Sequence, residues 1–218
     1  MRRCELRGVP LAWTSGVGVE GPWYYEPEGL GFFRTFGGGL LVTCGIEHSL
    51  FMAEDTASQY HYPPKQAESF GLHGRISNRP ARLAGYGERW DGDECTLFAE
   101  GETQVATVFG EQLVLRRRIE ARVGESRLHV HDVVENVGHD LTPHMLLYHV
   151  NAGFPVVDEG AEILVAASGV AALSTPVNVP YHVTLVPDFV TRTMTKVSSS
   201  AFRLDAVPLT KDPVSTVK

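Results

Sequence analysis

Cysteine is scarce in this sequence and shows no pairing pattern. The three cysteines, Cys4, Cys44 and Cys95, are odd in number and far apart, and none belongs to a Cys-x-x-Cys pair. A disulfide framework is therefore not expected, and a reducing, cytoplasmic setting is the default for such a chain. Each cysteine is expected to be a small buried hydrophobic residue rather than a nucleophile or metal ligand.

Long apolar runs are also missing. No stretch of the chain approaches the roughly 18 apolar residues that span a membrane. The N-terminal segment Met1–Arg7 is not followed by the apolar region of a signal peptide. Neither a membrane partner nor a secretory signal is predicted.

Basic residues are in the minority. Lys and Arg number 19 against 26 Asp and Glu, which gives a formal net charge of −7. The densest basic run, Arg116–Arg118, lies inside a stretch of alternating polar and apolar residues, which is typical of a solvated strand face. Nucleic acid is therefore not an expected partner.

Turn-forming residues are abundant. The 218 residues include 22 Gly and 13 Pro, and 43% are hydrophobic, so the chain can bury a sizeable core while forming many short strands. Between about residues 82 and 155 apolar residues recur with period two, as in Leu113, Leu115 and Ile119. Turn signals separate these stretches at Asp91-Gly92, 123–126 and 136–138. The pattern predicts an all-β antiparallel sandwich or barrel.

Other parts of the chain differ from this pattern. Residues 46–69 are the only candidate for a helix or a long loop. The Gly37–Gly39 run lacks the Lys-Ser/Thr of a phosphate-binding loop and indicates close backbone packing or a turn. Residues 164–218 contain no Glu and no Trp, so we expect one domain over 1–163 and a divergent or altered segment over 164–218.

Two of the nine histidines lie in polar, distinctive settings. His73 follows Leu72 and precedes Gly74, and His149 ends the run from Pro143. These elements resemble the Leu-His-Gly and Pro-x-x-Leu-x-x-His elements of galactose mutarotases. Longer stretches are similar to a bacterial subgroup of aldose 1-epimerase-like proteins of unknown specificity, known as domain of unknown function 4432. The stretches that carry this resemblance are 25–30, 34–45, 70–81, 143–153 and 154–160.

The resemblance implies a galactose mutarotase-like β-sandwich, or supersandwich, with a sugar-binding cleft. The implied chemistry is interconversion of sugar anomers: a base removes the C1 hydroxyl proton while an acid protonates the ring oxygen. By carry-over, His149 is the acid and His73 polarises ring hydroxyls. Arg34 is a candidate donor to sugar oxygens, and His48, Arg75 and His144 are weaker candidates for the cleft wall. A small-molecule sugar is the implied ligand, and no metal or cofactor is required.

The chain departs from the family pattern at its C-terminal end. The mutarotase base is a Glu near that end, whereas this sequence has no Glu after Glu162 and only Asp188, Asp205 and Asp212 are acidic there. We therefore expect a sandwich that is incomplete at the C-terminus, with exposed strand edges. The identity of the base and the oligomeric state stay open.

A metal-dependent sugar isomerase of the cupin type is one alternative. His129, His131 and Glu135 have the His-x-His-x3-Glu spacing of a cupin metal site and would share a strand face, with His149 as a fourth ligand. The glycine spacing around them does not fit that family. A solvated strand face explains the same three residues.

A carbohydrate-binding protein without catalytic activity is the other alternative. Sugar-binding sandwiches use aromatic platforms, although aromatic residues more often belong to a core. The absence of a recognisable catalytic base near the C-terminal end supports this alternative. The available aromatic residues are Trp13, Trp23, Tyr24, Tyr25 and Trp90.

Overall fold

The computed structural model describes most of the N-terminal three quarters of the chain. It describes residues 3–57, 66–159 and 161, together with the backbone of four C-terminal strands. The side chain of Asp205, and all of Asp188 and Asp212, lie outside the described residues, so the C-terminal acids are not placed. The division at residue 163 likewise stays a prediction. The four C-terminal strands are β11 (Ala171–Ala172), β12 (Leu185–Val186), β13 (Arg192–Met194) and β14 (Val197–Asp205).

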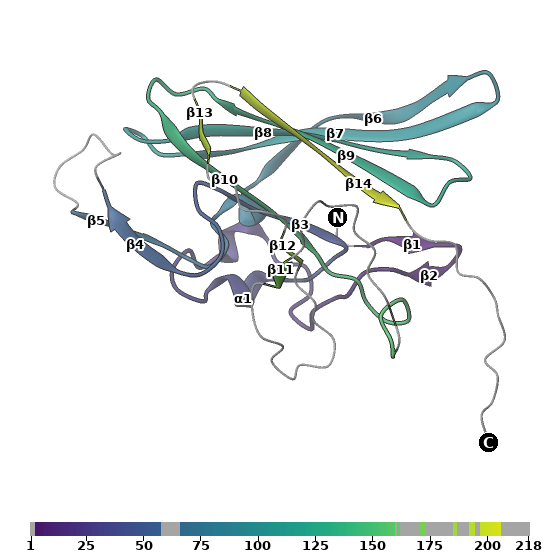
Figure 1. Ribbon diagram of the computed structural model, residues 1–218, viewed down its shortest axis with the longest axis horizontal. Helices are drawn as coiled ribbons and strands as arrows, with labels where there is room; N and C mark the ends of the chain where they lie inside the picture. Colours follow the sequence, from purple (N-terminus) through teal and green to yellow (C-terminus); the bar gives the residue numbers. More distant parts are fainter. Residues whose placement is uncertain are drawn as a thin grey trace.

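A five-stranded antiparallel sheet forms one layer of the molecule (Figure 1). Its strands run in the order β14-β9-β8-β7-β6, so every chain-adjacent pair from β6 to β9 is a hairpin. The turn at Gly92, where φ is +59°, closes the first hairpin as the Asp91-Gly92 signal predicted. The strand bounds are β6 (Ala81–Asp91), β7 (Glu94–Ala106), β8 (Gln112–Arg122) and β9 (Arg127–Asn136).

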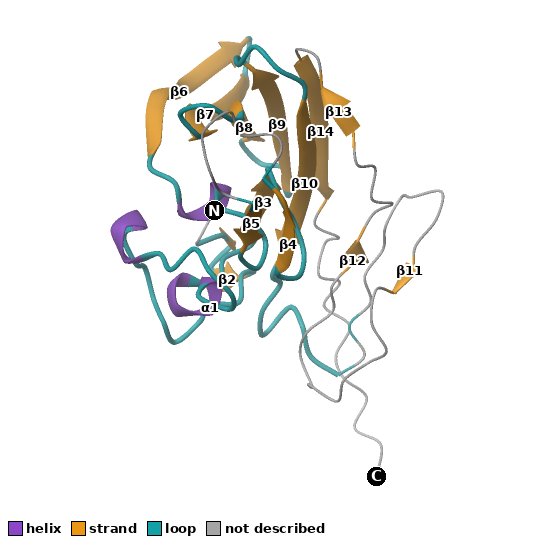
Figure 2. Cartoon of the chain, turned by 90° about the vertical axis from the view of Figure 1, so that its left-hand side faces the viewer, coloured by secondary structure: helices purple, strands orange, loops and turns teal. Residues whose placement is uncertain are grey.

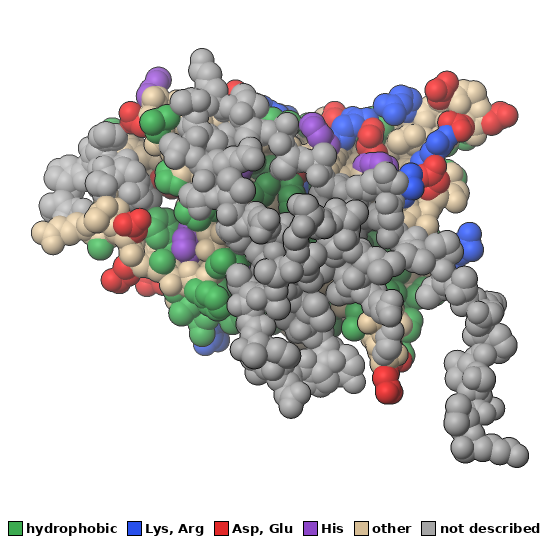
Figure 3. Space-filling view, in the orientation of Figure 1, with side chains coloured by type: hydrophobic (Ala, Val, Ile, Leu, Met, Phe, Trp, Pro, Cys, Tyr) green, Lys and Arg blue, Asp and Glu red, His purple; other side chains and the backbone are tan. Residues whose placement is uncertain are grey.

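Strand β8 confirms the prediction made from period-two alternation. Leu113 and Leu115 are buried on one face, while Arg116 and Arg118 on the other pair with acids of the neighbouring strands. Basic and acidic side chains accordingly intermingle over the projecting end of this sheet in Figure 3. The basic run therefore serves ion pairing within the sheet and does not form a basic patch.

A smaller sheet packs against the large one. Its order is β13-β10-β3, with β3 at Leu41–Ile46 and β10 at Thr142–Val150. The space between the two sheets holds one core cluster, to which the small sheet contributes Ile46 and Leu146. The all-β antiparallel sandwich predicted from the sequence is confirmed. The large sheet and a short 3-10 turn contribute Ile76, Val105, Leu113, Leu115 and Val134 to this cluster.

The outer face of the small sheet carries a second core cluster. Cys44 of β3 and Leu147 of β10 pack there with Phe32 and Leu72. Phe32 begins α1 (Phe32–Thr35), a single helical turn that lies beside β3 on this side (Figure 2). The remaining described elements are β1 (Glu5–Leu6), β2 (Val9–Pro10), η1 (Pro22–Tyr24), β4 (Ala53–Thr56), β5 (Ala67–Phe70) and η2 (Ile76–Asn78).

Two expectations about local structure have clear outcomes. The described part of 46–69 contains the β4–β5 strand pair, and the only α-helix of the described residues lies instead at Phe32–Thr35. A Cβ on Gly38, where φ is +71°, would come within 2.6 Å of the Trp13 carbonyl oxygen, so close packing explains the Gly37–Gly39 run.

All three cysteines are free, and Cys44 and Cys95 are buried. Among the described residues no helix is long and apolar enough to cross a membrane.

Candidate functional site

The two predicted histidines meet on the outer face of the small sheet. His149 lies near the end of β10, where its backbone pairs with Val42 of β3. His73 lies in the loop after β5 with a φ of +63°. Its N–H donates to the Leu50 carbonyl at 2.8 Å, and its own carbonyl accepts from the Gly45 N–H at 2.9 Å. The end of β3 therefore fixes the loop that carries His73 beside β10.

The rings of the two histidines are in contact. Their centroids are 5.6 Å apart and their planes meet at 76°, an edge-to-face arrangement. Helix α1 covers the pair from one side: Phe32 lies 5.1 Å from the His73 ring, and Phe36, directly after the helix, lies 5.5 Å from the His149 ring. Aromatic walls of this kind exclude water from polar groups and strengthen electrostatic interactions between them. We call His73 and His149 the histidine pair.

The surroundings keep His73 neutral at neutral pH. Burial, together with the smaller effects of the neighbouring His149 and His48, lowers its pKa to about 4. Its Nδ1 is buried and has no hydrogen-bond partner among the described residues. A neutral imidazole can donate through one ring nitrogen and accept through the other, so His73 can both orient and polarise a ligand hydroxyl.

The residues that follow His73 tie the loop to a buried carboxylate. Gly74 has a φ of +68°, and a Cβ there would come within 2.3 Å of the His48 carbonyl oxygen. The Arg75 N–H donates to Glu47 Oε1 at 3.0 Å. The Arg75 guanidinium also pairs with Glu47 and with Glu68, each at 3.3 Å. Arg75, predicted as a cleft residue, thus pairs with two acids of its own chain and also lies over the Phe70 ring, 5.9 Å from the ring centroid.

The other predicted binding residues occupy three different settings. The Arg34 side chain on α1 is 75% exposed and pairs with Glu26 at 3.4 Å. The His48 ring stacks on Phe70 with centroids 5.0 Å apart. It also makes a 2.7 Å hydrogen bond between Nε2 and the Phe51 carbonyl oxygen. Its influence on the pKa of His73 places His48 near the histidine pair.

His144 lies apart from the histidine pair. It is buried on β10, an odd number of residues from His149, so the two side chains leave opposite faces of the strand. His144 therefore points toward the space between the sheets, whereas His149 points toward α1. The binding roles of Arg34, His48, Arg75 and His144 stay predictions.

Glu47 is a site residue that the sequence analysis missed. Its side chain is only 4% exposed, and burial raises its pKa to about 7. Its Oε2 has no hydrogen-bond partner among the described residues. The available signal was an acid directly after the apolar strand Leu41–Ile46, where the chain leaves the core. Tyr25, whose pKa burial raises to about 12, donates from its hydroxyl to the Gly74 carbonyl at 3.0 Å beside this acid.

The structure does not assemble the predicted cupin-type metal site. His129 and His131 are exposed on the outer face of β9. Glu135 on the same face pairs with Arg116, and His149 belongs to the other sheet. In the part of the chain that the structure describes, no three His, Cys, Asp or Glu side chains are placed to hold a metal ion. The strand-face explanation of these residues is the one the geometry supports.

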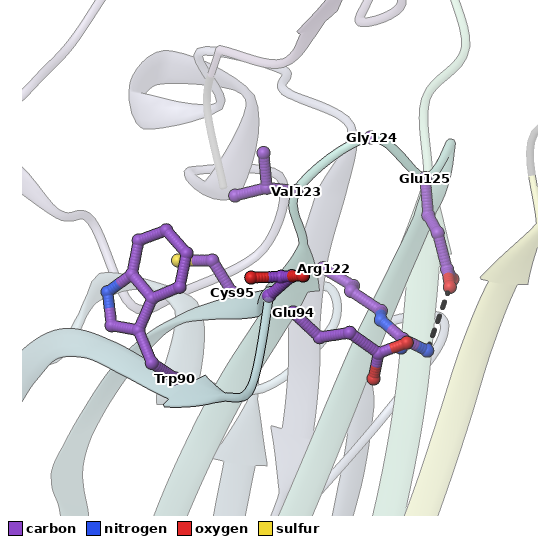
Figure 4. Close-up of a pocket in the computed structure, with 8 residues that line it drawn as sticks. Trp90, Glu94, Cys95, Arg122, Val123, Gly124 and Glu125 are labelled. Atoms are coloured by element: carbon purple, nitrogen blue, oxygen red, sulfur yellow. Dashed lines mark hydrogen bonds and ion pairs between the residues drawn. The ribbon is translucent and has the colours of Figure 1, made fainter.

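The predicted aromatic platforms are mostly exposed. Trp23, Tyr24 and Trp90 are the most exposed, at 79%, 64% and 61%, and Trp13 follows at 42%. Trp90 lines an open hollow of about 450 Å³ between the β6–β7 and β8–β9 turns (Figure 4). Arg122 crosses this hollow and pairs with Glu94 and Glu125. The hollow shares no residue with the histidine pair.

Comparison with known proteins identifies a family and a fold. The sequence model of DUF4432, a domain of unknown function, matches residues 1–178. No curated protein matches. Among solved structures, the chain is similar to a crystal structure of a putative aldose 1-epimerase from Klebsiella pneumoniae, with 24% sequence identity and a TM-score of 0.61. The match covers 73% of this chain and 39% of that chain, so this chain spans about two fifths of the solved protein. The likeness confirms the predicted aldose epimerase-like fold.

Proposed function

The chain belongs to the DUF4432 family, and on this premise we propose that it is a carbohydrate-active protein that interconverts the anomers of a small sugar. The observation that carries the proposal is the histidine pair, in which two imidazoles from distant parts of the chain meet edge to face 5.6 Å apart. The name of the structurally similar epimerase supports the same reaction class. The proposal requires no metal or cofactor. We also propose a cytoplasmic location with no nucleic-acid or membrane partner.

The proposed chemistry needs two groups, one protonated group that acts as an acid and one unprotonated group that acts as a base. The acid protonates the ring oxygen as the bond between that oxygen and C1 breaks, while a base removes the proton of the C1 hydroxyl to form the open-chain carbonyl. Rotation about the C1–C2 bond followed by the reverse steps yields the other anomer. His149 is the proposed acid. His73, held neutral by its lowered pKa of about 4, is suited to orient a ring hydroxyl without competing for the proton.

The geometry of the histidine pair suits a polar ligand with several hydroxyls. Phe36, which is only partly buried, presents aromatic surface beside the His149 ring, and the apolar face of a sugar ring can pack on such surface. A neutral His73 can fix one hydroxyl by a directional hydrogen bond. The histidine pair thus supplies binding and acid functions, and turnover additionally needs a base.

Polarimetry of freshly dissolved α-anomers of several aldoses tests this proposal. The wild-type protein should accelerate mutarotation, and His149→Ala should abolish the acceleration while leaving the fold intact by circular dichroism. His139→Gln removes an exposed histidine and serves as the matched control, with the wild-type rate expected. A well-folded wild-type protein that accelerates no aldose would overturn the enzymatic proposal.

Sugar binding without catalysis is the second candidate function, and the Trp90 hollow favours it. Trp90 presents an exposed indole on one side of the hollow, and the Arg122 guanidinium lies with Glu94 and Glu125 on the other side (Figure 4). Stacking surface and hydrogen-bonding groups in one hollow suit a sugar ring. Quenching of tryptophan fluorescence by sugars should then be lost in Trp90→Ala and kept in His149→Ala. The reverse pattern would assign binding to the histidine pair instead.

A further inference from the structure

A second polar hollow lies at the end of the molecule where β4 and β5 are drawn in Figure 1. It encloses about 170 Å³ between the β4–β5 pair, the β7–β8 turn and the segment that leads into β10. Five carboxylates line it, together with an apolar wall. We call it the acidic pocket. The five acids are Glu47, Glu54, Asp55, Glu111 and Asp140.

Two of these acids are buried close to one another. Glu47 and Glu111 are each 7% exposed, and the charge of Glu111 contributes to raising the pKa of Glu47. Arg75 forms ion pairs with both Glu47 and Glu68, so one cation is shared by two acids. Glu111 accepts from a neutral donor, the Thr107 hydroxyl, at 2.8 Å. Buried carboxylates therefore outnumber the cation that contacts them, an arrangement that is costly unless protons or a further cation compensate.

One carboxylate of the pocket has an oxygen without a hydrogen-bond donor. Glu47 Oε1 accepts from the backbone and the guanidinium of Arg75, which fixes the orientation of the carboxylate. Glu47 Oε2 is buried and has no hydrogen-bond partner among the described residues, although its side chain lines the pocket and is only 4% exposed. A buried acceptor without a donor is an uncommon feature of folded proteins, and a ligand that donates hydrogen bonds would satisfy it.

The spacing of the acids separates the classes of cation that would fit. A Ca²⁺ or Mg²⁺ ion needs several oxygens to converge within about 2.0–2.6 Å, and no three His, Cys, Asp or Glu side chains of the described residues do so. An alkylammonium group reaches further, because its three N–H donors bond oxygens at about 2.7–3.2 Å in different directions. The apolar wall of Leu141, Pro143 and Met145 gives its carbon chain a surface to pack against.

We propose that the acidic pocket binds the primary ammonium group of a small organic cation, with Glu47 as the principal acceptor and Glu111 as the second. The volume of about 170 Å³ is below the range of roughly 300–1,000 Å³ typical of drug-sized ligands, so the ligand is an ammonium head with a short alkyl stem. This site is distinct from the histidine pair and does not depend on the proposed epimerase activity.

Isothermal titration calorimetry with n-butylammonium chloride tests the site. The wild-type protein should bind n-butylammonium at pH 8, and n-butanol, which has the same carbon chain without the charge, should give no heat. Glu47→Gln should weaken n-butylammonium binding at least tenfold. Glu125→Gln, which removes an exposed carboxylate at the far hollow, should bind like the wild type. Lowering the pH from 8 to 6 should weaken binding because Glu47, with a pKa of about 7, becomes protonated.

Three results would overturn the proposal. Equal binding of n-butanol would show a merely apolar pocket, and unchanged affinity in Glu47→Gln would place any ammonium site elsewhere. Heats with CaCl₂ or MgCl₂ but none with n-butylammonium would show a metal site instead. Should Glu47→Gln fail to fold by circular dichroism, Glu111→Gln supplies the same comparison.

Discussion

The imidazole of His73 meets the imidazole of His149 edge to face, with 5.6 Å between the ring centroids. Protonation of one ring therefore disfavours protonation of the other, and burial adds to this effect at His73. A neutral His73 can serve as the hydrogen-bonding partner of an acid, because it does not compete for the proton.

His149→Gln should raise the pKa of His73 from about 4 toward the ordinary value of 6.5. The rise should be partial, because burial is the largest cause of the lowered pKa and His149 only the second. An NMR titration of the His73 ring measures this directly. His139→Gln, at an exposed position, should leave the His73 pKa unchanged. An unchanged pKa in His149→Gln would mean that the two rings are not coupled in solution.

Asp132→Asn should destabilise the fold by about 3–5 kcal/mol, the cost of breaking a buried ion pair from one side. Asp132 is fully buried and accepts from Arg117 Nε at 2.7 Å and from the Tyr148 hydroxyl at 2.8 Å. Arg117 also donates to Thr43 of β3. The network joins the two sheets directly beside His149. Urea unfolding followed by circular dichroism measures the change.

Glu135→Gln provides the matched control for this network. Glu135 and Arg116 pair across the same two strands, β9 and β8, but on the outer face of the sheet. Exposed ion pairs contribute little because water and salt screen them. A loss of stability in Glu135→Gln as large as that in Asp132→Asn would show that the buried network contributes no more to the free energy of unfolding than an exposed ion pair.

Gly74→Ala should destabilise the fold and disturb the histidine pair. The Gly74 φ of +68° disfavours any side chain, and the new Cβ would come within 2.3 Å of the His48 carbonyl oxygen and 2.5 Å of the Gly45 carbonyl oxygen. Gly124→Ala is the control, since Gly124 has a φ of +88° but no atom within 4 Å of the added Cβ. The control should cost about 1–2 kcal/mol, and Gly74→Ala distinctly more. Equal melting temperatures of Gly74→Ala and Gly124→Ala would contradict the close approach of the Gly74 backbone to the His48 and Gly45 carbonyl oxygens.

Glu47→Gln should change how stability depends on pH. The pKa of Glu47 is raised from 4.5 to about 7 in the folded protein, so between these pH values the folded state holds more protons than the unfolded state. Its contribution is therefore fully present below pH 4.5 and is lost as the pH rises through about 7, by on the order of 2–3 kcal/mol. Relative to the wild type, Glu47→Gln should become progressively more stable from pH 4.5 to pH 7.5.

Unfolding free energies at several pH values check this slope. A constant offset between Glu47→Gln and the wild type would mean that Glu47 does not titrate in this range. Glu88→Gln, which removes an exposed acid from β6, should give parallel curves. The comparison uses the slope, so the fixed loss of contacts to Arg75 does not affect it.

Several features of this protein were determined by the sequence alone. The alternation of Leu113 and Leu115 with Arg116 and Arg118 specified a strand with one buried and one solvated face, because side chains in a strand alternate between two faces. Asp91-Gly92 specified its hairpin because the turn needs a residue that accepts a positive φ. The Leu-His-Gly and Pro-x-x-Leu-x-x-His elements singled out His73 and His149 before any contact was known.

Only the tertiary structure decided which residues meet. Pairing of β10 with β3 brings His149 next to the loop of His73, a long-range contact that no local pattern contains. Burial is the largest cause of the raised pKa of Glu47, the charge of Glu111 raises it further, and Arg75 opposes the rise, so segments remote in sequence set this pKa. Burial and charge proximity are properties of the packed chain, and they set the chemistry of residues whose identity the sequence supplies.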